Sequence, residues 1–141
     1  MTNRHFILIP VRYGDLDAQG HVNNARFLSY VEHARITYLK VLGLWDGVDF
    51  LNLGLIVADA HIAYRAPIEF GATIRVIGGV VSMGTKSLRF THRLEDDATG
   101  QLYAEAEMVM VAYDYHTRQS IVIPDDWREK ISAFESIPIK G

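Results

Sequence analysis

The sequence contains no cysteine among its 141 residues. This absence excludes disulfides, thiolate zinc sites, iron–sulfur clusters and a cysteine nucleophile, and it is typical of a reducing compartment. The sequence also lacks an uninterrupted apolar run of membrane-spanning length, and no small-residue cleavage site follows its short apolar N-terminal stretch. It therefore predicts neither a membrane span nor a secretory signal, and we expect a cytoplasmic protein without membrane association.

The sequence has no excess of positive charge either. It carries 14 Lys and Arg against 17 Asp and Glu, which gives a formal net charge of −3. Nucleic-acid binding depends on a basic surface, so we expect no nucleic-acid partner. The histidines are scattered along the chain and their spacing does not gather three ligands, so we expect no metal site.

The sequence does contain enough apolar residues for one core, since 49% of its residues are hydrophobic. A chain of this length buries roughly two-thirds of the surface that its unfolded form exposes, and it needs no disulfide or metal to do so. We find no internal repeat, low-complexity tract or linker. We therefore expect residues 1–141 to form one domain.

The hydrophobic pattern predicts one long helix among several strands. An apolar run over 6–11 predicts a first strand, in which Pro10 suits a sheet edge or a bulge. Apolar residues then recur every three or four positions from Asn24 to Leu42, which predicts a helix closed by Gly43. Period-two alternation predicts further strands over 56–64, 74–81, 88–94, 101–115 and 121–123.

This order predicts an α+β fold, in which a long helix packs against a curved antiparallel sheet of five to six strands and a short helix follows. Gly78 and Gly79 suggest a bend or bulge in their strand. Asp126 and Glu129 resemble a capping box that begins the terminal helix. In the strand over 56–64, alternation places five residues on one face: Ile56, Ala58, Ala60, Ile62 and Tyr64.

Polar and glycine residues are concentrated in residues 12–24 (RYGDLDAQGHVNN), where the first strand leads into the long helix. The first turn of a helix has unpaired N–H groups and a positive dipole end, which stabilise an oxygen that becomes anionic. A carboxylate just before that turn can act on the same atom as nucleophile or general base, as acyl transfer requires. Asp15, Asp17 and Asn23 equally suit turns and an N-cap. His21 suits a base, a partner of Asp17, or a histidine bonded to the backbone.

Two stretches resemble a known family. Residues 12–24 resemble the signature of hotdog-fold acyl-CoA thioesterases of the 4-hydroxybenzoyl-CoA thioesterase type, and they are also similar to plant acyl-ACP thioesterases. Residues 64–76 resemble the family's next pattern, in which a Pro and a Gly break an extended segment. The first stretch is followed by further matching residues: Phe27, Tyr30, Glu32, Ala34 and Arg35. The resemblance covers nearly the whole chain and implies a hotdog fold and hydrolysis of a thioester to a free carboxylic acid and CoA.

The resemblance also implies catalytic roles. Asp17 matches the family's catalytic aspartate, which attacks the thioester carbonyl or activates a water for that attack. The backbone N–H of Asn24 falls where the family polarises the thioester oxygen. His21 matches a histidine of the acyl-ACP branch, in which an asparagine stands at the position of Gln19.

Binding residues and partners are implied in the same way. The turn over 84–89 aligns with the family's basic nucleotide-binding turn, and CoA phosphates need cationic contacts. The candidate substrate- and CoA-binding residues are Tyr13, Gly20, Asn23, Lys86 and Ser87. No cofactor is implied, because CoA is part of the substrate.

The family resemblance implies a homodimer with its active site between subunits, usually paired into a homotetramer. Independently, a single twisted sheet over one helix leaves edges and one face that association would protect. Two alternatives stay open: an acyl-ACP thioesterase, and a non-catalytic acyl-CoA-binding module. Such a module would not need Asp17.

Overall fold

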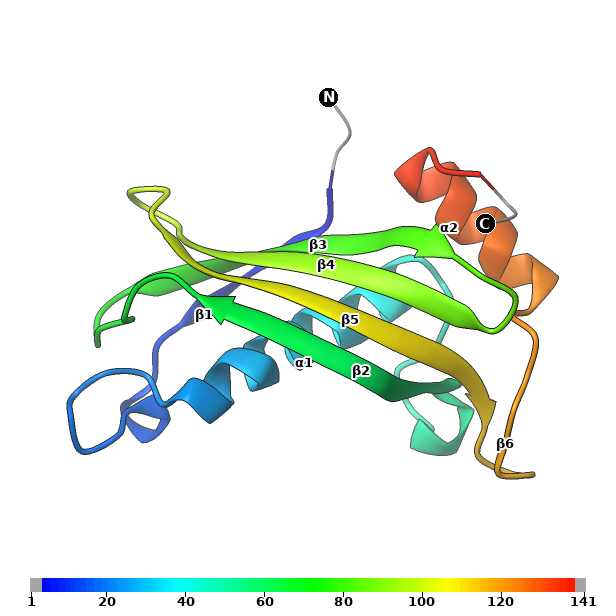
Figure 1. The fold of residues 1–141 in the computed structure, drawn as a ribbon, viewed down its shortest axis with the longest axis horizontal. Helices are drawn as coiled ribbons and strands as arrows, with labels where there is room; N and C mark the ends of the chain where they lie inside the picture. The colour runs from blue at the N-terminus through cyan, green and yellow to red at the C-terminus, as the bar shows by residue number, and fades with distance from the viewer. Residues whose placement is uncertain (1–3, 139–141) are drawn as a thin grey trace.

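The computed structural model describes residues 4–138 as a six-stranded antiparallel sheet with one long helix across one face (Figure 1). The strands are β1 (Phe6–Pro10), β2 (Leu55–Tyr64), β3 (Thr73–Met83), β4 (Ser87–Asp96), β5 (Leu102–Asp114) and β6 (Gln119–Ser120). The helices are α1 (Asn24–Val41) and α2 (Asp125–Glu135), with the short 3-10 helices η1 (Tyr13–Asp15) and η2 (Phe50–Asn52). The predicted α+β arrangement is confirmed.

The sheet has two open edges. Its strand order is β1-β3-β4-β5-β2, and β6 pairs with the end of β5. Among the described residues, β1 therefore pairs only with β3, and β2 only with β5. Pro10 lies in the edge strand β1, as predicted, where its missing N–H costs no central ladder bond.

Local signals define both ends of α1. The Asn23 side chain accepts a hydrogen bond from the Ala25 N–H at 2.9 Å, which caps the first turn. At the other end Gly43 has φ 75°, and the Leu44 N–H donates to the Leu39 carbonyl at 2.8 Å. A left-handed glycine with this return bond is the usual way for a helix to stop. The predicted span of the helix is confirmed to within one residue.

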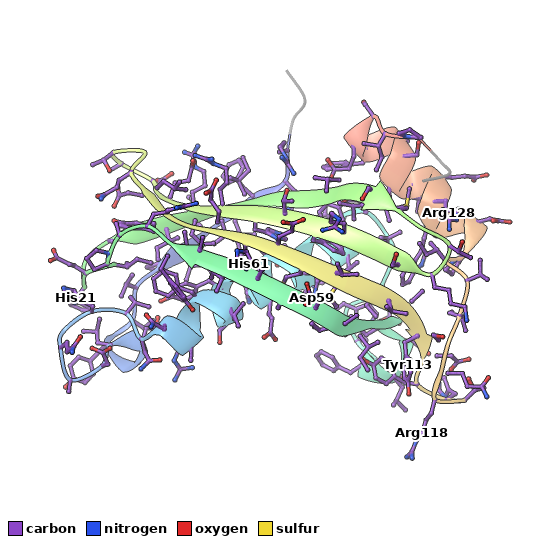
Figure 2. The ribbon with its side chains drawn as sticks, viewed as in Figure 1. His21, Asp59, His61, Tyr113, Arg118 and Arg128 are labelled. Atoms are coloured by element: carbon purple, nitrogen blue, oxygen red, sulfur yellow. The ribbon has the colours of Figure 1, made fainter. Side chains whose placement is uncertain are left out.

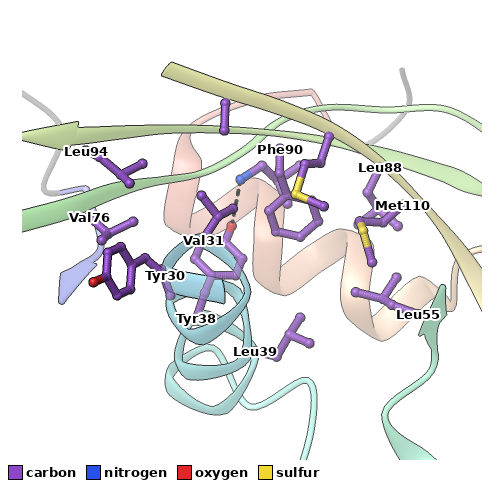
Figure 3. Packing of buried hydrophobic residues seen from close by; sticks show 14 of the residues in the cluster. Tyr30, Val31, Tyr38, Leu39, Leu55, Val76, Leu88, Phe90, Leu94 and Met110 are labelled. Carbon is purple, nitrogen blue, oxygen red and sulfur yellow. Dashed lines mark hydrogen bonds between the residues drawn. The ribbon is translucent and has the colours of Figure 1, made fainter. Parts of the chain in front are cut away.

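The core lies between α1 and the inner face of the sheet (Figure 3). Small side chains on β5 let the helix lie close to the sheet, while larger ones on β4 fill the remaining space. The Tyr38 hydroxyl accepts a hydrogen bond from the Val80 N–H, drawn dashed in Figure 3, and donates to Glu135 of α2 at 2.7 Å. The buried residues on the two strands are Tyr103, Ala104, Ala106, Met108, Met110, Ala112, Leu88, Phe90, His92 and Leu94.

The predicted face of β2 is wrong at its beginning. A bulge at Ala58 shifts the pairing with β5, so that Val57 lies opposite Met110 and Ala60 lies opposite Met108. Leu55 and Val57 therefore share the inner face with the later residues of the strand, and Ile56 faces outward. One inserted residue inverts the alternation, which a strict period of two cannot anticipate.

The expected bulge at Gly78 and Gly79 falls slightly later. Pairing with β4 continues through both glycines, and the register shifts only between Val80 and Ser82. Glycine is required at both positions for lack of space: a Cβ on Gly78 would collide with the Thr91 carbonyl, and a Cβ on Gly79 would collide with the Tyr38 ring. Close approach of neighbouring groups explains both residues.

Two predictions near the C-terminus are also wrong. The helix α2 begins at Asp125 after Pro124, whose carbonyl accepts from the Arg128 N–H at 3.1 Å, and no side chain caps it. Asp126 instead forms an ion pair with Lys130 one turn on. The last strand is β6 at 119–120 and not the predicted 121–123, because the β5–β6 turn closes earlier.

No helix within residues 4–138 combines the length and apolar character needed to cross a membrane.

Candidate active site

The loop between η1 and α1 is a small hairpin. Leu16 and Val22 form a bridge, the Asp17 N–H donates to the His21 carbonyl at 2.9 Å, and the Gly20 N–H returns to the Asp17 carbonyl at 3.0 Å. Gly20 has φ 81°, a conformation that favours glycine. His21 lies at the left end of the molecule in Figure 2. The turn brings Asp17 to the same cleft as Asn24, the first residue of α1.

An open cleft of about 370 Å³ lies between this hairpin and the end of β2. Its polar wall comes from the hairpin and the first residue of α1. Its apolar wall contains Phe27 and Tyr64, whose rings meet edge to face with centroids 4.9 Å apart. The residues around the cleft are Asp17, Gln19, His21, Val22, Asn24, Phe27, Tyr64, Arg65, Ala66 and Pro67. All three predicted catalytic residues therefore line one cavity.

The first turn of α1 leaves one N–H group available at this cleft. The Ala25 N–H is bound by the Asn23 side chain, and the Arg26 N–H by the Asn23 carbonyl at 2.8 Å. The Asn24 N–H has no acceptor within residues 4–138. It stands at the positive end of an 18-residue helix, in the same cleft as the Asp17 carboxylate. A free donor and a carboxylate around one cavity are what attack on a carbonyl requires.

His21 joins the hairpin to the segment that follows β2. It bridges Glu69 through the backbone, and its Nε2 lies 3.9 Å from the Glu69 carboxylate. The neighbouring Val22 N–H donates to the Ile68 carbonyl at 2.9 Å. The His21 backbone thus contacts Asp17 on one side and Glu69 on the other, and its half-exposed side chain lines the cleft.

Of the predicted binding residues Gly20, Asn23 and Tyr13, the first two have local structural roles. Gly20 makes the turn of the hairpin, and Asn23 caps α1. Tyr13 lies in η1, outside the cleft, with 83% of its surface exposed. Their contact with a substrate stays a prediction.

The structure does not bring Lys86 and Ser87 to this cleft. They lie where β4 begins, and Lys86 donates to the Ser120 hydroxyl at 3.2 Å. The cleft lies at the other end of the sheet, because Tyr64 pairs with Ala104 and so stands beside the end of β4. From Ser87 to Leu94, the β4 residue beside the cleft, the strand advances seven residues, which corresponds to about 23 Å. Within one chain this turn is therefore not part of the cleft.

The apolar wall of the cleft was not among the predicted site residues. Phe27 is one of the residues that match the family pattern and Tyr64 lies on the predicted face of its strand, and both also form the cleft. Arg65 lies at the cleft and forms an ion pair with Glu105 at 3.0 Å. Pro67, which ends the strand pattern and stands opposite the helix start, was the available signal for this wall.

Within the described part of the chain, no three His, Asp or Glu side chains gather in a way that could hold a metal ion.

These features together define a class of protein. An antiparallel sheet lies over one long helix, and a carboxylate and a free helix N–H share a cleft at the beginning of that helix. This combination is that of a hotdog-fold thioesterase, as the sequence resemblance implied.

The chain belongs to the Thioesterase-like superfamily, which matches residues 11–131. It is 28% identical over 123 residues to the long-chain acyl-CoA thioesterase FadM of Escherichia coli (strain K12), covering 87% of this chain and 93% of FadM. It is 27% identical over 123 residues to a 1,4-dihydroxy-2-naphthoyl-CoA hydrolase of Synechococcus elongatus, covering 83% and 89% of the two chains. A Thermus thermophilus thioesterase, solved with coenzyme A and Zn, superposes with a TM-score of 0.82 and 34% identity, covering 94% and 95%. The chain is a thioester hydrolase with the hotdog fold.

Proposed function

We propose that this thioesterase hydrolyses acyl-CoA to a free carboxylic acid and CoA, with Asp17 as nucleophile or general base. The observation that carries the proposal is the meeting of Asp17 and the free Asn24 N–H in one cleft. The names of FadM and of the naphthoyl-CoA hydrolase specify CoA esters, and the Thermus neighbour was solved with CoA. These relatives support CoA as the carrier.

The proposed reaction begins with the thioester carbonyl oxygen accepting a hydrogen bond from the Asn24 N–H. As a base, Asp17 takes a proton from a water whose oxygen attacks the carbonyl carbon; the C–S bond then breaks and the CoA thiolate receives the proton. As a nucleophile, Asp17 attacks the carbon itself, expels CoA and forms an anhydride that water hydrolyses. In both routes negative charge develops on the carbonyl oxygen, which the helix N-terminus stabilises. His21, in the same cleft, assists with proton transfer.

The walls of the cleft suggest how the substrate lies. The Phe27 and Tyr64 rings offer an apolar surface to the acyl group. Arg65 offers a cation at the cleft for the phosphate-bearing part. The predicted role of Lys86 and Ser87 requires that a second copy of the chain bring its β3–β4 turn over this cleft.

We further propose that the chain forms a homodimer or homotetramer. The free edge of β2 carries exposed Ile56 and Val57, and η2 and the loop before it add exposed Val48, Phe50 and Leu51. Open strand edges and clustered apolar side chains are features of an association surface. The cytoplasmic location and the independence from cofactors stay predictions.

The experiment is release of free thiol from short, medium, long and aromatic acyl-CoAs. The wild type should turn over part of this panel, and Asp17→Asn should lose at least about 100-fold in kcat, since it removes the attacking or proton-accepting group. Asp126→Asn is the matched control, because Asp126 is an exposed aspartate on α2 whose ion pair with Lys130 is worth little. It should retain wild-type turnover.

Each outcome decides between the alternatives. Undiminished turnover by Asp17→Asn would remove the catalytic proposal. Turnover of acyl-ACP but of no acyl-CoA would show that the substrate is an acyl group carried by ACP. A first turnover in H₂¹⁸O tests the nucleophilic role of Asp17: label found in the enzyme carboxylate shows that an anhydride formed and was hydrolysed at the Asp17 carbonyl, because the base route places label in the released acid alone.

A further inference from the structure

Asp15 is a buried carboxylate two residues before Asp17, and the reaction described above does not use it. Only 2% of its surface is exposed, as is also true of Tyr30 on α1. The Tyr30 hydroxyl donates to Asp15 Oδ2 at 2.8 Å across 15 residues of sequence. Buried carboxylates are rare unless they are fully hydrogen-bonded, so the burial of Asp15 depends on the hydrogen bonds that it accepts.

The remaining acceptor positions of Asp15 are also occupied. Oδ2 accepts from the Arg12 N–H at 3.1 Å, and Oδ1 accepts from the Arg12 guanidinium at 3.2 Å. The Arg26 guanidinium lies 4.0 Å from Oδ1. Burial alone would raise the pKa of Asp15, but the hydrogen bonds from the Arg12 amide, Tyr30 and the Arg12 side chain outweigh it and lower that pKa. The group is therefore an anion at neutral pH.

The position of Asp15 connects three parts of the site. Its carbonyl accepts the Asn23 N–H at 2.9 Å, which joins the two ends of the hairpin that carries Asp17. Its side chain bonds to Tyr30, which lies about two turns beyond Asn24 in α1. The Asp17 side chain makes no hydrogen bond to α1: within residues 4–138 it accepts only the Gln19 N–H, at 2.9 Å. The Asp15 side chain therefore links the hairpin that carries Asp17 to the second turn of α1.

We propose that Asp15 and Tyr30 are positioning residues for thioester hydrolysis: their buried hydrogen bond holds the hairpin against α1 and so fixes the Asp17 carboxylate relative to the Asn24 N–H. The inference rests on the proposed function, because it concerns how the same two groups are aligned. Small displacements of reacting groups cost large factors in rate, while binding of the distant parts of the substrate is unaffected. The expected signature is a loss in kcat with KM preserved.

The test compares two Tyr→Phe variants on the same helix. Tyr30→Phe removes only the hydroxyl that bonds Asp15, and Tyr38→Phe removes an equally buried hydroxyl that bonds Glu135 at 2.7 Å, away from the cleft. Both variants should lower Tm by similar amounts. Tyr30→Phe should lower kcat about 10- to 100-fold with KM for acyl-CoA within about twofold, and Tyr38→Phe should leave kcat within about twofold.

Asp15→Asn is the second variant, and it tests the positioning role by itself if Tyr30→Phe does not fold. Asp15→Asn weakens the Asp15–Tyr30 hydrogen bond and also removes the charge that pairs with Arg12, so it should lose kcat as well. The double variant should lose about as much as the larger single loss, because both substitutions act on the same hydrogen bond. Wild type, Asp17→Asn and all variants are measured together, with Tm recorded for each.

The outcomes separate this inference from the proposed function. If Asp17→Asn is inactive while Tyr30→Phe and Asp15→Asn match Tyr38→Phe in kcat, the positioning role is wrong and the catalytic role of Asp17 stands. A rise in KM with kcat preserved, or losses that multiply in the double variant, would also overturn it. If Asp17→Asn is active, both proposals fall, because there is then no catalytic carboxylate to position.

Discussion

At the scale of single residues, His92 is a buried imidazole in the middle of the sheet. It is 2% exposed, stacks on Phe90 with ring centroids 6.2 Å apart, and has no hydrogen-bond partner on either ring nitrogen within residues 4–138. Burial, and secondarily the positive charge of Arg35, lowers the pKa of His92 from 6.5 to about 3. The core therefore accepts His92 only in its neutral form.

This environment predicts acid sensitivity of folding. Below pH 6.5 the unfolded chain binds a proton at this residue and the folded chain does not, so stability falls between pH 6.5 and about 3. The expected slope from His92 alone is about 1.4 kcal/mol per pH unit in the free energy of unfolding. Urea unfolding at pH 7 and pH 5 measures it.

His92→Leu should flatten that pH dependence, because Leu has similar volume and no titrating group. His33→Gln is the control, since His33 is exposed on α1. An unchanged pH dependence in His92→Leu would show that other groups, such as the partly buried His5 whose pKa burial also lowers, account for the acid sensitivity.

Residue roles were only partly predictable from the sequence. The spacing of Asp17, His21 and Asn24 was enough to select a common cleft, because all three lie in one short segment. The sequence did not distinguish the burial of Asp15 from the exposure of a turn carboxylate. That difference depends on Tyr30, which reaches Asp15 only after α1 has formed and packed.

At the scale of elements, the crossing of β3 over Tyr38 limits the side chain at position 79. A Cβ added to Gly79 would lie 2.6 Å from the Tyr38 ring and against the Glu135 carboxylate, and those two groups are hydrogen-bonded to each other. Gly79→Ala should therefore destabilise the protein by about 1–3 kcal/mol through overpacking. Chemical denaturation measures this change.

Gly14→Ala is the control for that variant. No atom of residues 4–138 lies within 4 Å of a Cβ at Gly14 and the φ of Gly14 is not positive, so the effect of this substitution on the free energy of unfolding should stay small. Equal losses in the two variants would contradict the close approach of β3, α1 and α2 at Gly79.

Most elements followed from hydrophobic periodicity, since α1, β4 and β5 each bury one regular face. The predictions were wrong where contacts with another segment determine the register of a strand or the start of a helix. The bulge at Ala58 is defined by pairing with β5, and the start of α2 by Pro124 and the Arg128 N–H. Such choices depend on contacts between distant segments, which a local pattern does not contain.

At the scale of the whole molecule, the two open edges of the sheet differ in character. β1 is short and ends in Pro10, whereas β2 is ten residues long and adjoins the apolar residues of η2. Proline and short length protect an edge, so association is expected through β2. Light scattering should give a dimer or tetramer.

Two variants with closely matched exposure test which edge associates. Val57 on β2 is 46% exposed and Leu8 on β1 is 48% exposed. Val57→Lys should shift the protein toward monomer, because a lysine on an edge strand opposes pairing, and Leu8→Lys should leave the assembly intact. The reverse result would place the interface on β1.

The central claim is that Asp17 performs the chemistry and is not needed to bind the substrate. The most direct measurement is acyl-CoA binding and turnover by Asp17→Asn in parallel, using the best ester of the thiol-release panel, with binding determined by calorimetry. We expect a Kd within about threefold of the wild-type KM and almost no thiol release, because binding and reaction use different groups of the cleft. Undiminished thiol release by Asp17→Asn would contradict it.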